Sequence, residues 1–182
     1  MSRILIIGYG NSLRRDDGFG WHLARSLQRA IYDPEVEIIA CQQLTPDLAE
    51  RIRCAQYVIF ADACADGDTA GLSLRRLKVK RASSTKFSHV TSPETLMTMA
   101  RTLYGAAPCA SFLLTARTFD LGYGEELSAD MSLVLDKAFD RVLALCAFLS
   151  PALAHLSPTS DDVLPMASPK RSVTIFTRGQ YA

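Results

Sequence analysis

Short apolar runs alternate along the chain with longer segments whose apolar residues recur at helical spacing. The runs predict β-strands at residues 3–7, 36–41, 57–61 and 110–116. Leu72, Leu74 and Leu77 suggest one more strand at residues 72–77, fourth in chain order and more exposed than the others. The longer segments predict helices at residues 21–31, 45–52, 92–104 and 128–149. Runs that are apolar throughout are typical of strands buried on both faces, as in parallel sheets. The alternation therefore predicts a three-layer αβα fold of the α/β class.

Local signals mark several helix ends. Thr45 and Ser92, each followed by proline, predict N-caps with proline at the first helical position. Ser128 predicts the N-cap of the long last helix, and Gly105 the end of the helix before it.

The turn between the first strand and the first helix has an unusual composition. Residues 8–20 read Gly-Tyr-Gly-Asn-Ser-Leu-Arg-Arg-Asp-Asp-Gly-Phe-Gly, with four glycines and two adjacent acids. A dinucleotide fingerprint is excluded because Leu13 occupies its third glycine position, and the Gly-Lys-Ser/Thr of a P-loop is absent. Two carboxylates would also repel phosphate. The turn thus suits a cation or a proton, and we expect no nucleotide cofactor.

Several candidate ligands converge on one edge of the predicted sheet. Asp16 and Asp17 follow the first strand, Asp62 ends the third, and His89 precedes the helix that Ser92 opens. In α/β sheets, ligands bind beyond the carboxyl ends of the strands. Two carboxylates and an imidazole there predict a divalent metal site with open positions. The helix dipole favours an acid at a helix start, which would explain one of the two adjacent acids. We assign Asp16 either this role or a role in supporting the site.

Each of these residues also has a purely structural alternative. Asp62 could cap a turn, and His89 could be an ordinary loop histidine.

Composition narrows the possible partners. The net charge of +1 gives no reason to expect a nucleic acid or an anionic membrane as partner, and no apolar run approaches the ~20 residues of a membrane helix. The first strand begins at residue 3, which leaves no room for a signal peptide. The five cysteines form no C-x-x-C pair and predict reduced, mostly buried thiols. We therefore expect a cytoplasmic monomer without membrane insertion.

Two further segments stand out by composition. Residues 151–182 are rich in proline and serine and predict a peripheral or disordered tail after a single domain at residues 1–150. Residues 75–86 hold six basic side chains and no acid. They fit either a solvated edge strand, where basic residues discourage pairing, or a docking surface.

Four ordered motifs between residues 3 and 149 resemble those of the hydrogenase maturation endopeptidases. The opening pattern G-x-G-N-x-L-x-x-D-[DE]-x-x-G matches the turn from Gly8 to Gly20. The other three matches are the strand-end A-D-A at residues 61–63, the serine and histidine at Ser88-His89, and the late G-x-x-L-S at residues 124–128.

This resemblance implies a function and a set of site residues. The family consists of soluble proteases that trim the large subunit of nickel-iron hydrogenases near its C-terminus. Its metal ligands fall on Asp17, Asp62 and His89 of this sequence. The resemblance further implies a twisted, mostly parallel five-stranded sheet, a hydrogenase large-subunit precursor as partner, and nickel that the substrate carries.

Two alternatives remain open. A signalling receiver domain also places paired acids after its first strand, and Asp62 would then be phosphorylated. Such domains have a lysine at the end of the fifth strand, where this chain has Ala116-Arg117-Thr118, and their acids follow the strand directly. A nickel-binding adaptor that docks on hydrogenase without cutting it would use the same ligands as the protease.

Overall fold

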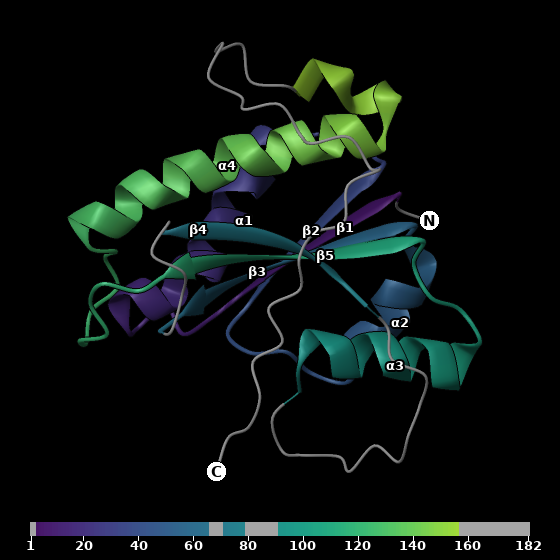
Figure 1. Cartoon of the computed structure of the whole chain (residues 1–182), viewed down its shortest axis with the longest axis horizontal. Helices are drawn as coiled ribbons and strands as arrows, with labels where there is room; N and C mark the ends of the chain where they lie inside the picture. Colours follow the sequence, from purple (N-terminus) through teal and green to yellow (C-terminus); the bar gives the residue numbers. More distant parts are fainter. Residues whose placement is uncertain (1–2, 66–70, 79–90, 157–182) are drawn as a thin grey trace.

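A central five-stranded sheet lies between two layers of helices (Figure 1). The computed structural model describes residues 3–65, 71–78 and 91–156. The strand order is β2-β1-β3-β5-β4. The strands are β1 (Ile4–Tyr9), β2 (Val36–Cys41), β3 (Tyr57–Cys64), β4 (Leu72–Leu77) and β5 (Ala110–Arg117). All neighbours pair in parallel except β4, which is antiparallel to β5. The predicted three-layer α/β fold with a mostly parallel five-stranded sheet is confirmed.

The helices divide between the two faces of the sheet. Figure 1 shows α1 (Phe19–Ala30) and α4 (Ala129–Leu149) on one face, and α2 (Leu48–Cys54) and α3 (Pro93–Tyr104) on the other. Alternate strand residues point to opposite faces, so each buried strand feeds two cores. On β1, Ile4 and Ile6 join the core under α1 and α4, whereas Leu5 and Ile7 join the core over α2 and α3.

Most of the predicted helix ends are confirmed. Ser92 Oγ accepts a hydrogen bond from Thr95 N, and Ser128 Oγ accepts one from Met131 N. Gly105 ends α3 in the left-handed conformation, with φ of 67°.

The predicted start of the second helix was wrong. Thr45 is not an N-cap, because α2 begins only at Leu48 and its cap position is Asp47. A tight turn comes first, in which Leu48 N donates to Thr45 O and Ala49 N to Pro46 O. Turn hydrogen bonds of this kind satisfy the backbone before the helix starts.

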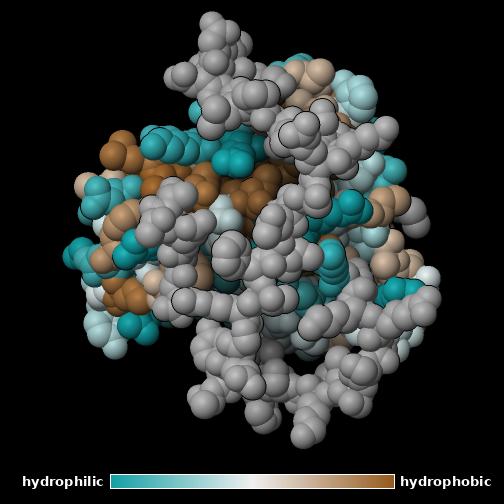
Figure 2. Space-filling view, viewed as in Figure 1, coloured by the Kyte–Doolittle hydropathy of each residue, from teal (hydrophilic) through white to brown (hydrophobic). Residues whose placement is uncertain are grey.

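The edge strand β4 packs under the long helix α4. Its Leu72 and Leu74 are half-buried against the core on that side, together with Val134 of α4. Figure 2 shows apolar residues, in brown, gathered where α4 crosses this edge of the sheet. Further along the strand, Arg75 forms an ion pair with Glu94 at 3.1 Å, as expected for a basic edge strand.

The core continues past Ser150. A 3-10 helix, η2 (Pro151–Leu156), packs against α4, and its Leu153 is fully buried in the core. The buried Ser150 donates from Oγ to Glu35 Oε2 at 3.3 Å. Six residues that the sequence analysis assigns to the tail therefore contribute to the folded unit. The rest of the tail and most of the basic segment lie outside the described residues.

Candidate functional site

The glycines of the 8–20 turn let the start of α1 pass very close to the ends of two strands. A Cβ on Gly8 would lie 1.9 Å from Gly20 O, and a Cβ on Gly20 would lie 2.2 Å from Ala61 O. No larger residue fits at either position without moving the backbone. This close packing holds the short 3-10 helix η1 (Arg15–Gly18) at the carboxyl edge of β1 and β3.

Asp17 and Asp62 interact at this edge. Asp17 lies in η1, where its Oδ2 accepts a hydrogen bond from Asn11 N at 3.2 Å. Burial raises the pKa of Asp62 to about 6; hydrogen bonds from Tyr9 and Ala63 oppose the rise, and the charge of Asp17 adds to it. The Asp62 carboxyl thus holds its proton to a higher pH than an exposed aspartate does.

Tyr9 and Asp62 face the same side of the sheet. Ile7 and Phe60, two positions earlier on β1 and β3, are buried in the core over α2 and α3. Since alternate residues of a strand share a face, Tyr9 and Asp62 also point to that side, where the Tyr9 hydroxyl is near enough to Asp62 to influence its pKa. Strand register extends this polar row across the sheet to Cys41, Thr115 and Ser73.

The first turn of α3 comes close to this row. Burial raises the pKa of Tyr9, and the nearby charges of Asp62 and then Glu94 raise it further, so its hydroxyl stays protonated and can donate. Glu94 is the second residue of α3. His89, the third predicted ligand, lies outside the described residues. Within those residues, no three His, Cys, Asp or Glu side chains gather into a group that could hold a metal ion.

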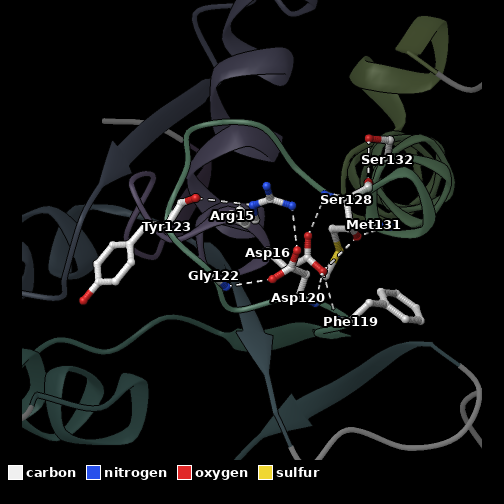
Figure 3. Close-up of polar contacts among 9 residues, drawn as sticks. All are labelled: Arg15, Asp16, Phe119, Asp120, Gly122, Tyr123, Ser128, Met131 and Ser132. Atoms are coloured by element: carbon white, nitrogen blue, oxygen red, sulfur yellow. Dashed lines mark hydrogen bonds and ion pairs between the residues drawn. The ribbon is translucent and has the colours of Figure 1, made fainter.

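Asp16 is held by a set of buried hydrogen bonds whose partners the sequence did not reveal. Its carboxylate is fully buried and accepts four hydrogen bonds, from Phe119 N, Asp120 N, Ser128 N and Ser128 Oγ, at 2.8–2.9 Å (Figure 3). Burial by itself would raise the pKa of Asp16, but these hydrogen bonds outweigh it and lower the pKa below its ordinary value.

Of the two roles predicted for Asp16, these bonds favour support of the site. Asp16 lies in the first turn of η1, but neither η1 nor α1 has a side-chain hydrogen bond at its N-cap. Asp16 fastens the loop of residues 118–128 to the turn that carries Asp17. The sequence shows the two adjacent acids and, about 100 residues later, the glycine-containing loop. It does not show that the loop binds Asp16.

Arg15 makes a second set of bonds to the same loop. It pairs with Asp120 at 2.6 Å, and its backbone N donates to Gly124 O at 2.9 Å. Its φ of 44° is the one positive value among the non-glycine residues that the structure describes. A non-glycine residue in this region is strained, and the bonds to the loop compensate for that strain.

The other two histidines make contacts of their own. His22 Nε2 is 3.1 Å from Glu125 O, and burial lowers the pKa of His22, which keeps its ring neutral. His155 lies in η2, 3.9 Å from Asp33.

Several solved structures that share this fold are hydrogenase maturation proteases. The hydrogenase 2 maturation peptidase of Thaumarchaeota archaeon SCGC_AB-539-E09 matches with a TM-score of 0.61 and 24% identity, over 80% of this chain and 99% of that one. The endopeptidase HybD of Escherichia coli matches with a TM-score of 0.64 and 20% identity, over 80% of this chain and 93% of that one. The [NiFe] hydrogenase maturation protease HycI of Thermococcus kodakarensis matches with a TM-score of 0.60 and 24% identity, over 81% of this chain and 92% of that one.

Comparison by sequence adds no assignment. No protein-family model and no curated protein sequence matches the chain. Among the described residues, no helix is long and apolar enough to cross a membrane. The structure thus has the fold of the hydrogenase maturation proteases.

Proposed function

We propose that this chain is a hydrogenase maturation endopeptidase. It would remove a C-terminal peptide from the large-subunit precursor of a nickel-iron hydrogenase after nickel has been inserted. The observation that carries the proposal is the interacting pair Asp17 and Asp62, at the carboxyl edge of a sheet with the fold of HybD and HycI.

Asp17, Asp62 and His89 are the residues proposed to contact the nickel that the precursor carries. Two carboxylates and an imidazole suit a divalent transition metal and leave positions open. A bound metal can polarise the scissile carbonyl or activate water. His89 comes four residues before the start of α3, whose first turn approaches Tyr9, and this supports its place in the site.

The raised pKa of Asp62 has a consequence for such a site. A metal competes with protons for its ligands. Asp62 is ionised and ready to contact a cation above pH 6, and it becomes protonated below it. Capture of the nickel-loaded precursor should therefore weaken as the pH falls through about 6.

The sheet topology argues against the receiver alternative. Receiver domains have the doubly wound strand order 2-1-3-4-5. Here β5 lies between β3 and β4, and β4 runs antiparallel. Phosphorylation of Asp62 therefore has no support from the fold.

The direct test is cleavage of purified nickel-loaded precursor. Asp17→Ala, Asp62→Ala and His89→Ala should each abolish cleavage while thermal unfolding still shows a folded protein. Asp140→Ala, at an exposed position of α4, is the matched control and should cleave normally. Wild-type cleavage by all three site variants would refute the assignment. Binding without cleavage by the wild type would favour the adaptor.

A further inference from the structure

Exposed apolar side chains lie on the turn that leads to Asp17 and on the loop fastened to that turn. Leu13 is 53% exposed, Leu121 is 40% exposed and Tyr123 is 88% exposed. Tyr123 and Leu121 belong to the 118–128 loop, and Leu13 belongs to the turn to which this loop is fastened. Single exposed apolar residues are ordinary on a protein surface, but a cluster beside a candidate site indicates a contact surface.

Main-chain and arginine contacts hold these residues together. Gly124 N donates to Leu13 O at 3.0 Å, so the loop and the turn run side by side. Arg14 Nη2 donates to Leu121 O at 3.2 Å, and the guanidinium lies 5.8 Å from the centroid of the Tyr123 ring. Tyrosine and arginine, with tryptophan, are enriched among the side chains that dominate binding at protein interfaces.

The loop is ordered before any partner arrives. The buried Asp16 carboxylate ties its two ends, and Asp120 Oδ1 accepts from Gly122 N at 2.7 Å inside it. Figure 3 shows Tyr123 pointing outward on one side of this anchored loop and Phe119 pointing away on the other. A pre-ordered surface loses little conformational entropy on binding.

The cluster is continuous with the site. Asp17 N donates to Arg14 O at 3.1 Å, so one turn of backbone carries both the exposed Arg14 and the candidate ligand. The surface therefore lies within one turn of backbone of a candidate ligand.

We propose that Leu13, Arg14, Leu121 and Tyr123 form a docking surface for the protein substrate. The occupant is an apolar segment of the hydrogenase precursor next to its cleavage site. Its apolar side chains pack on the leucines and the Tyr123 ring, and one of its backbone or carboxylate oxygens accepts from Arg14. The inference rests on the proposed function, of which it specifies the substrate contact.

Tyr123→Ser tests this surface, and Tyr32→Ser is its matched control. Tyr32 is 87% exposed, close to the 88% of Tyr123, but lies away from the site after α1. Cleavage kinetics on the purified precursor should show KM raised about tenfold for Tyr123→Ser, as expected for a residue that dominates an interface, with kcat within about twofold. Tyr32→Ser should match the wild type. Leu121→Ser should act in the same direction, and thermal unfolding of all variants should stay that of the wild type.

A photo-crosslinking residue at position 123 gives a readout that does not depend on catalysis. It should label the precursor, and the same group at position 32 should not. Unchanged KM for Tyr123→Ser and Leu121→Ser, with normal cleavage by the wild type, would overturn the docking surface and leave the protease assignment standing. A change confined to self-association of this chain would also overturn it, in favour of a contact between copies. A wild type that neither binds nor cleaves the precursor would overturn both.

Discussion

Two adjacent aspartates in the same turn have different environments. Asp16 points inward and is saturated by four donors from a loop more than 100 residues away in sequence. The Asp17 carboxylate raises the pKa of Asp62 through its charge. Sequence spacing identified the pair as unusual and placed it at the correct edge of the sheet. It could not identify the partners of Asp16, because they come from a loop near the other end of the domain.

Asp16→Ala should destabilise the protein, and more so at neutral than at acid pH. The substitution leaves buried N–H donors of residues 119, 120 and 128 without an acceptor, which costs roughly 2–3 kcal/mol. The pKa of Asp16 in the folded protein lies below its ordinary value of 3.8, so in acid the unfolded chain takes up this proton more readily. The stability that Asp16 contributes is thus complete above 3.8 and is lost as the pH falls through its folded-state pKa.

Urea unfolding at pH 7 and in acid measures this effect. The difference in unfolding free energy between wild type and Asp16→Ala should narrow on acidification. Asp140→Ala, at an exposed position, should show no such pH-dependent difference. Equal stability of Asp16→Ala and wild type at pH 7 would mean that the four hydrogen bonds contribute nothing.

Substitution by alanine should destabilise the protein more at Gly20 than at Gly105. An alanine Cβ at Gly20 would meet backbone oxygens of Ala61 and Tyr9 at 2.2 and 2.4 Å, and backbone cannot rotate away as a side chain can. Gly20→Ala should therefore cost about 3 kcal/mol or more. Gly105→Ala meets nothing within 4 Å and adds only the strain of φ at 67°, about 1–2 kcal/mol. Chemical unfolding of the two variants gives the comparison, and a Gly20→Ala protein as stable as Gly105→Ala would contradict the close packing.

At the scale of elements, local signals predicted what depends on local chemistry. Four of the five strands follow from apolar runs, and β4 follows from the spacing of its leucines. The Ser92 and Ser128 caps follow from the residues at the helix starts. The start of α2 and the 3-10 helix η1 were missed because turn hydrogen bonds compete with helix formation there. The burial of Leu153 was missed because the spacing of prolines shows only that a long helix cannot form there. It does not show that this segment packs against the core.

The end of the folded unit gives a prediction about truncation. A chain that ends at Leu156 should keep wild-type stability, since the proline-rich sequence beyond it lacks helical periodicity. A chain that ends at Ser150 loses Leu153, whose full burial contributes about 1.5–3 kcal/mol. Thermal unfolding of the two truncated proteins tests this, and Leu153→Ala in the full chain should reproduce most of the loss. If both truncated chains were as stable as wild type, η2 would not belong to the core.

For the whole molecule, topology decided which residues meet. The rule that ligands bind beyond the carboxyl ends of parallel strands correctly placed Asp17 and Asp62 at one edge. The sequence could not order β5 between β3 and β4, because strand order depends on how long connections cross the sheet. That order argues against a receiver domain, and it brings Thr115 and Ser73 into the polar row beside Asp62.

The last prediction concerns the metal that triggers cleavage. Two apolar cores hold the described part of the chain together, so chelator treatment should leave the isolated protein folded. Nickel would arrive within the precursor. An open site of Asp17, Asp62 and His89 could then distinguish nickel-loaded from nickel-free precursor, because only the loaded form offers a cation to these ligands.

Cleavage of purified precursor with and without nickel, by enzyme first treated with chelator, measures this discrimination. Nickel-loaded precursor should be cut and nickel-free precursor left intact, and Asp62→Asn should lose cleavage because an amide replaces the carboxylate. Tyr32→Ser serves as the control for handling of the protein, since its site is remote and exposed. Equal cleavage of both precursor forms would refute nickel sensing even if the protease assignment survived. In that case Asp17 and Asp62 would have to act on the peptide bond without the substrate's nickel.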